Sequence, residues 1–148
     1  MSFHEKRALV SLASAVLIPL IYAAMMWPRL PTGDAYGVEV FRFWGSFFII
    51  LIPVVIVAKI AIYILFSIIN TIATRENDPG LEDERDKLIE ARANLNSANV
   101  FALGFVLAML ALVLDQPPTT MFIILFIGGI TSEIISELSQ FVFYRRGF

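Results

Sequence analysis

Residues 82–92 read EDERDKLIEAR and form the longest charged stretch in a chain of 148 residues. The sequence around this stretch is mostly apolar, because 58% of all residues are hydrophobic and only 16% are charged. Typical soluble domains have about 45–50% apolar and about 25% charged residues. Two long apolar runs precede the charged stretch and two follow it. This pattern predicts an all-α, polytopic membrane protein, in which four transmembrane helices form two hairpins joined by a charged cytoplasmic amphipathic helix.

The boundaries of the predicted spans follow from the apolar runs and from the breakers between them. A helix needs about 20 residues to cross a membrane. We expect such helices, within a single domain over 1–148, at residues 8–27, 43–70, 98–114 and 121–143. Residues 115–118 contain two prolines and predict a tight turn.

The segment 28–42 is rich in proline and glycine and predicts a loop. Trp27, Tyr36 and Trp44 lie in or beside this loop. Tryptophan and tyrosine are enriched where a membrane protein passes from lipid to water. We therefore expect these three rings to form part of an aromatic belt.

Residues 71–97 form the predicted connector between the two hairpins. Leu81, Leu88 and Leu95 recur every seven residues, which is a helical spacing. No helix breaker lies between Leu81 and Leu114. We expect the amphipathic helix to continue without interruption into the third membrane span.

The distribution of lysine and arginine predicts the orientation of the chain. Eight of these residues lie in the N-terminal segment, the connector and the C-terminal segment, whereas the opposite loops contain only Arg29 and Arg42. By the positive-inside rule, we expect both termini and the connector to be cytoplasmic. The lipid bilayer is then the main partner of the chain.

The composition argues against several classes of function. The chain has no cysteine and one histidine, His4, which disfavours thiolate metal sites, disulfides and histidine-dependent catalytic triads. The net charge of −2 gives no reason to expect direct binding of nucleic acid. We expect a protein that is not an enzyme and that uses no metal or cofactor.

Ionisable residues inside the apolar runs are candidates for a functional site. Lys59 lies in the second run, and Glu133 and Glu137 lie in the fourth. Lys59 and Glu133 are at similar distances from the ends of their runs, so we expect an ion pair between them. The pair could fix how the two helices dock, relay a proton or ion, or bind a ligand.

The fourth apolar run also carries a stripe of small and polar residues at intervals of four. Gly128, Ser132, Ser136 and Gln140 form this stripe, which is typical of helices that pack closely in lipid. An internal packing seam is one interpretation. A homodimer face or a polar cavity is the alternative.

The connector has an acidic side that could contact another protein. Glu82, Asp86 and Glu90 are spaced four residues apart, and Asp83 lies beside them. A solvated, charge-balanced face is the simplest interpretation. The alternative is docking of a basic cytoplasmic partner, which such a face would favour.

Two segments resemble a known group of proteins. Residues 82–90, EDERDKLIE, and residues 144–147, YRRG, are similar to segments of small, uncharacterised bacterial four-span inner-membrane proteins, DUF2178-like. The resemblance covers about the second half of the chain. It implies a multi-pass protein of the bacterial inner membrane and carries no activity.

Two functions from different classes fit these patterns. The first is a non-enzymatic regulatory or interaction protein that contacts a cytoplasmic partner through the acidic connector. The second is a small proton- or ion-coupled transporter or channel, as a homodimer, that uses Lys59, Glu133 and Glu137.

Overall fold

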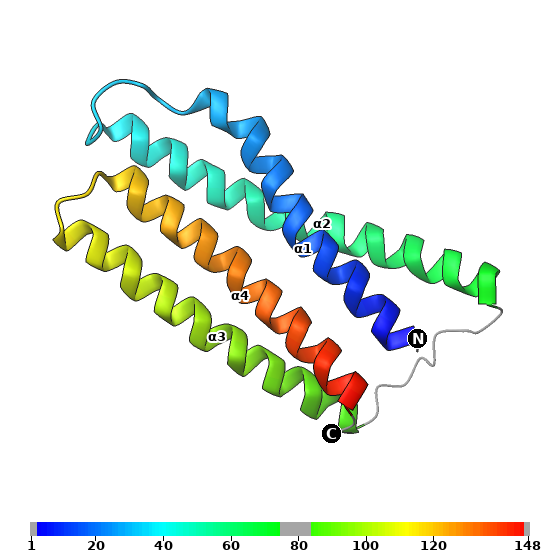
Figure 1. Cartoon of the computed structure of the whole chain (residues 1–148). Helices are drawn as coiled ribbons and strands as arrows, with labels where there is room; N and C mark the ends of the chain where they lie inside the picture. The colour runs from blue at the N-terminus through cyan, green and yellow to red at the C-terminus, as the bar shows by residue number, and fades with distance from the viewer. Residues whose placement is uncertain (1–2, 75–83, 147–148) are drawn as a thin grey trace.

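The computed structural model describes residues 3–74 and 84–146, and this part of the chain is all-α. A short 3-10 helix, η1, covers Trp27–Arg29. The α-helices alternate in direction along the bundle (Figure 1) and cover α1, Phe3–Met26; α2, Val38–Thr74; α3, Glu84–Val113; and α4, Pro118–Arg146. One end of the bundle therefore contains the start of α1, the end of α2, the start of α3 and the end of α4. We call this the charged end.

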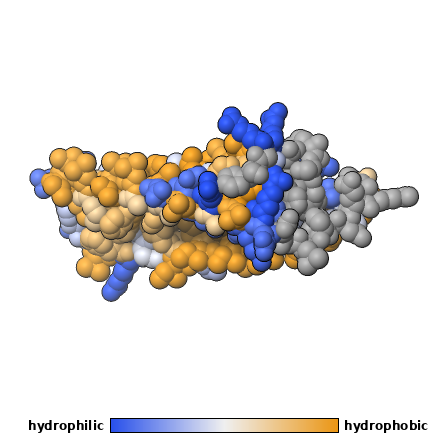
Figure 2. Space-filling model, turned by 90° about the horizontal axis from the view of Figure 1, so that it is seen from below, coloured by the Kyte–Doolittle hydropathy of each residue, from blue (hydrophilic) through white to orange (hydrophobic). Residues whose placement is uncertain are grey.

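Each of the four helices is long and apolar enough to cross a membrane. Their large apolar side chains are mostly exposed, and Ile49 and Val113, for example, expose 72% and 77% of their surface. Figure 2 shows hydrophobic residues over most of the length of the bundle, with hydrophilic residues gathered mainly toward one end. A soluble monomer rarely exposes so large an apolar surface. The helices thus indicate a multi-pass membrane protein.

The first loop is shorter than the sequence predicts. The Tyr36 N–H donates to Asp34 Oδ1 at 3.1 Å, and the Gly37 N–H donates to the Asp34 carbonyl at 2.9 Å. This tight turn ends at Gly37, and residues 38–42 contain neither proline nor glycine. Helix α2 consequently begins at Val38, whereas the prediction placed its start at Phe43.

Helix α3 is continuous from Glu84 to Val113, so the predicted helix is unbroken over its described part. It ends in a Schellman motif, because Gln116 N–H donates to Ala111 O and Asp115 N–H donates to Leu112 O. Asp115 has a φ of 56°, the left-handed value that this motif requires at that position. Pro118 then starts α4, so the predicted turn is present.

Helices α3 and α4 make the most extensive contact among the described elements. A Cβ atom added to Gly104 would lie 3.1 Å from Gly128 Cα, so the two backbones nearly touch. Ala108, one turn further along α3, is fully buried. Small residues at such positions allow close helix packing in lipid, where apolar burial provides no driving force.

The first half of helix α2 packs into the bundle through aromatic side chains. Trp44 and Phe47 are 2% and 3% exposed and belong to an aromatic cluster with Phe122, Phe126 and Tyr22. Trp44 stacks on Phe122 with 5.6 Å between ring centroids. The second half of α2 diverges from α4 toward the charged end (Figure 1).

The buried position of Trp44 corrects one prediction. Trp27 and Tyr36 are 56% and 61% exposed, as an aromatic belt requires. Trp44 instead faces the interior, because α4 presents Phe122 opposite its ring. Trp44 thus holds α2 in the bundle.

Candidate functional site

The centre of the bundle contains an ion-pair site formed by α2 and α4. Lys59 Nζ pairs with Glu133 Oε1, which confirms the predicted ion pair. The same Nζ lies 3.7 Å from Glu137 Oε1. Glu133 and Glu137 are four residues apart and share one face of α4, so both carboxylates can reach one ammonium group.

The position and charge of this site are unusual for an apolar helix. Glu133 precedes Arg145 by 12 residues, which places it about 18 Å along α4 from the charged end. A charge at such depth costs at least about 2.5 kcal/mol in a bilayer unless it is paired or hydrated. One ammonium and two carboxylates therefore meet at this site.

The three charged side chains differ in exposure. The Glu137 side chain is 11% exposed, whereas those of Lys59 and Glu133 are 27% and 42% exposed. Glu137 is thus enclosed by protein, and Glu133 is open to a neighbouring space. One carboxylate is held in place while the other is accessible.

Ser11 of α1 completes the enclosure of Glu137, a role that was not predicted from the sequence. Its hydroxyl donates a hydrogen bond to Glu137 Oε1. Ser14, one turn later, donates to the Ser11 carbonyl at 2.7 Å. The first apolar run contains few hydroxyl groups. Ser11 and Ser14 were therefore the sequence feature that could have indicated a polar contact of this helix.

The stripe predicted on α4 is divided between two surroundings. Ser132 and Ser136 are 8% and 6% exposed and lie at the seam with α3. Ser132 donates to the Gly129 carbonyl at 2.9 Å, and Ser136 donates to Asn94 Oδ1 at 3.3 Å. Helix α3 of the same chain thus covers this part of the stripe, which forms a seam inside the bundle. Gln140 instead lines a polar cavity with Glu137.

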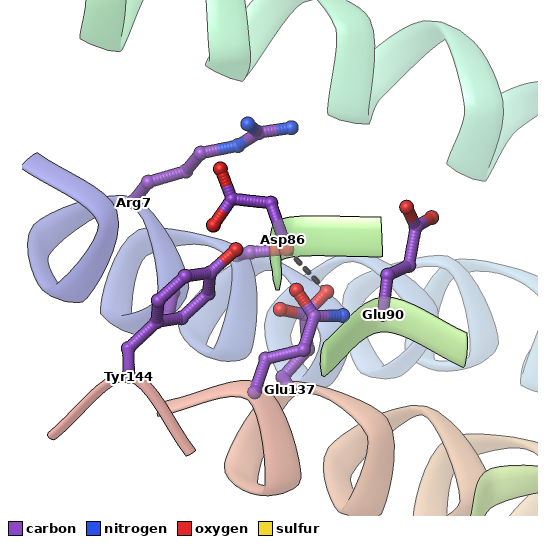
Figure 3. Close-up of a pocket in the computed structure, with 8 residues that line it drawn as sticks. Arg7, Asp86, Glu90, Glu137 and Tyr144 are labelled. Carbon is purple, nitrogen blue, oxygen red and sulfur yellow. Dashed lines mark hydrogen bonds between the residues drawn. The ribbon is translucent and has the colours of Figure 1, made fainter. Parts of the chain in front are cut away.

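The polar cavity has a volume of about 220 Å³ and lies near the charged end between α1, α3 and α4. Figure 3 shows Arg7 coming from α1, Asp86 and Glu90 from α3, and Glu137 and Tyr144 from α4. The full lining is Arg7, Ala8, Ser11, Asp86, Glu90, Glu137, Gln140 and Tyr144. Glu137 therefore connects the ion-pair site with a polar space that leads toward the charged end.

Two of the predicted partner-binding residues line the same polar cavity. Asp86 is half-buried, and both Asp86 and Glu90 line this space between helices. Glu82 and Asp83, the other two residues of the predicted face, lie outside the described residues. The described part of the acidic stripe consequently faces Arg7 and Glu137 across a cavity, although Glu90 also has exposed surface.

A larger apolar cavity lies on the other side of the ion-pair site. It has a volume of about 550 Å³, and its walls come from all four helices. Lys59 and Glu133 are its charged residues, and its aromatic residues are Phe48, Phe101, Phe122 and Phe126. The exposed surface of Glu133 thus faces an apolar space.

A middle cavity of about 290 Å³ separates α1 from the second half of α2. Its lining includes Lys59, Ser11 and Tyr63. The Arg7 guanidinium lies over the Tyr63 ring, 4.6 Å from the centroid, and bridges the two helices at this point. Lys59 therefore borders both the middle and the apolar cavity, and the ion-pair site lies where these spaces meet.

A resemblance to DUF2178-like membrane proteins is expected from residues 82–90 and 144–147 and stays a prediction. The structure describes Glu84 to Glu90 as the first turns of α3, and Tyr144 to Arg146 as the last turn of α4. These segments lie together at the charged end. Comparison of the chain with protein-family models, curated proteins and solved structures gives no match, so its function is inferred from its own residues.

Proposed function

We propose that the chain is a small ion-coupled membrane transporter that exchanges a proton or another cation at Lys59, Glu133 and Glu137. The observation that carries this proposal is the position of one ammonium and two carboxylates between a polar and an apolar cavity. Ionisable groups at such depth commonly mark the path of an ion or a substrate. The chain would act without enzymatic chemistry.

The two neighbouring carboxylates of the site support exchange of a cation. A proton, an organic cation or an alkali metal ion that displaces the Lys59 ammonium would meet both carboxylates. Glu137 borders the polar cavity, and Glu133 borders the apolar one. A cation can therefore reach the two carboxylates from different directions.

The packing of α2 supports a movement of its second half during transport. The aromatic cluster holds the first half of α2, whereas Lys59 lies in the second half, which borders the middle and apolar cavities. Pro53 lies between the two halves of α2, and a helix can bend at a proline because the backbone hydrogen bonding is interrupted there. Such a movement would alter the distance between Lys59 and the two carboxylates.

Transport can be tested with purified protein in lipid vesicles that contain a pH-sensitive dye. We expect an imposed pH gradient to dissipate when sodium, potassium or ethidium is added outside. Glu133→Gln and Glu137→Gln should each remove this cation-dependent proton movement. Glu39→Gln is the matched control, because Glu39 lies in the first turn of α2, away from the site. Wild-type vesicles that move no protons with any of the three cations would refute the proposal.

A regulatory protein that contacts a cytoplasmic partner is the second candidate. The continuity of α3 favours it, because one helix carries Glu90 at the charged end and Gly104 at the seam with α4. A contact at Glu90 could therefore move the seam. Recovery of one defined partner with wild type, but not with Asp86→Asn/Glu90→Gln, would support this candidate. Equal recovery of every partner would exclude it.

A further inference from the structure

The apolar cavity has the size and lining of a site for an organic ligand. Ligand pockets are about 300–1,000 Å³ in volume and are lined mainly by apolar and aromatic side chains. This cavity has about 550 Å³, and most of its wall is hydrophobic. Lys59 and Glu133 are the only charged groups among the described residues that line it.

The charged residues at the cavity indicate the sign of the ligand. Lys59 is already shared by Glu133 and Glu137, so its ammonium is engaged by carboxylates. Glu133 is the more exposed of the two carboxylates. A cationic group in the cavity could pair with the exposed Glu133 carboxylate, whereas an anionic group would have to compete with both carboxylates for Lys59.

The aromatic lining indicates the kind of cation. Four phenylalanines border the cavity, and aromatic faces attract organic cations, including quaternary ones. A small hydrated metal ion would gain little from an apolar wall. A cation with apolar substituents would use both the phenylalanines and Glu133.

We propose that the apolar cavity binds a lipophilic monovalent cation, with its charge toward Glu133 and its apolar groups among Phe48, Phe101, Phe122 and Phe126. This assignment rests on the proposed function and adds to it the chemical class of the exchanged cation. It commits to this occupant over a lipid acyl chain, because an acyl chain has no positive charge to meet Glu133.

Binding can be measured by equilibrium dialysis of the full chain in lipid nanodiscs, with empty nanodiscs subtracted. Tetraphenylphosphonium is the probe, and tetraphenylborate is its control of the same shape and opposite charge. We expect saturable binding of the cation and no saturable binding of the anion. Glu133→Gln should weaken binding of the cation at least about tenfold. Equal binding of the two probes, or no binding of the cation, would overturn the assignment.

Replacing Gly129 in the cavity wall with a larger residue offers a way to fill the cavity and keep the fold. A Cβ atom added to Gly129 has no atom within 4 Å, and Gly129 lines the cavity. Gly129→Leu should therefore fold and lose binding of tetraphenylphosphonium. Gly45→Leu is the matched control, because Gly45 also has open space and lies outside the cavity lining. Binding retained by folded Gly129→Leu would overturn the assignment to this cavity.

The binding and transport experiments fail in different ways. Binding of the cation without proton movement would leave the assignment intact and refute the transporter. Proton exchange with sodium or potassium, but no binding of tetraphenylphosphonium, would leave the transporter intact and refute the assignment. Loss of binding in Glu133→Gln but not in Gly129→Leu would place the cation at the carboxylates and outside the apolar cavity.

Discussion

Gly104 and Gly128 bring the backbones of α3 and α4 into direct contact. A Cβ atom on Gly104 would lie 3.1 Å from Gly128 Cα, and one on Gly128 would lie 3.4 Å from Gly104 Cα. The obstructing atoms belong to a backbone, which cannot rotate away as a side chain can. The seam between these helices thus depends on the absence of a side chain at Gly104.

Gly104→Ala should separate α3 from α4 and destabilise the bundle by about 1–3 kcal/mol, the usual effect of overpacking a close contact. Denaturation in mixed detergent, followed by circular dichroism, measures the change in the free energy of unfolding. Gly129→Ala is the control, because its Cβ has no atom within 4 Å. It should be neutral or stabilising, since alanine favours a helix by about 1 kcal/mol over glycine. Equal losses in the two variants would argue against the seam.

Trp44→Ala should destabilise the bundle by about 3–5 kcal/mol, because a buried aromatic ring is replaced by a cavity. Trp44 is 2% exposed, whereas Trp27 is 56% exposed. Trp27→Ala should therefore change stability by no more than about 0.5 kcal/mol. Thermal unfolding of the two variants in detergent provides the comparison.

The same two tryptophans provide a spectroscopic check. They are the only tryptophans in the chain, so each replacement leaves one tryptophan whose fluorescence can be measured. Trp44 alone, in Trp27→Phe, should resist an aqueous quencher and a brominated lipid. Efficient quenching of Trp44 by brominated lipid would show that its ring faces the membrane.

Lys59→Met should destabilise the bundle more than Glu133→Leu does. Loss of Lys59 leaves two neighbouring carboxylates without their cation, and we expect a cost of about 2–3 kcal/mol. Loss of Glu133 leaves Lys59 with Glu137 at 3.7 Å, and we expect about 1 kcal/mol or less. The double variant should lose less stability than the sum of the single losses. Additive losses would contradict a direct pair.

Ser11→Ala should weaken the attachment of α1 to α4. The Ser11 hydroxyl donates to the Glu137 carboxylate, and hydrogen bonds to charged groups contribute about 1.5–3 kcal/mol. Ser14→Ala is the matched control, since the Ser14 hydroxyl donates to a carbonyl of its own helix. We expect a change of no more than about 0.5 kcal/mol for Ser14→Ala. Similar losses in both variants would indicate a local effect within α1.

The sequence was sufficient to predict the helices and one tertiary contact. Apolar runs separated by breakers located four helices, and the absence of a breaker after Leu81 predicted the continuity of α3. Counting residues along two antiparallel helices placed Lys59 and Glu133 at one depth, where they pair. These features depend on distance along the chain, which a sequence contains directly.

The rotation of each helix about its axis was harder to predict. Lipid is as apolar as a packed interior, so hydrophobicity does not distinguish a lipid-facing side from a buried one. Trp44 was therefore assigned to the aromatic belt, although it stacks on Phe122. Ser11 was missed for the same reason, and nothing in the spacing of Asp86 and Glu90 indicated a cavity shared with Arg7.

The ion pair at Lys59 also constrains how the protein is made. Its two members are 74 residues apart, and translation at about 5–20 residues per second separates their synthesis by about 4–15 seconds. If the helices insert in order, the first hairpin enters the bilayer with an ammonium that has no counterion. An unpaired charge is costly in the bilayer interior, so in that order of insertion the final depth of the second helix is expected to depend on the arrival of Glu133 with the fourth.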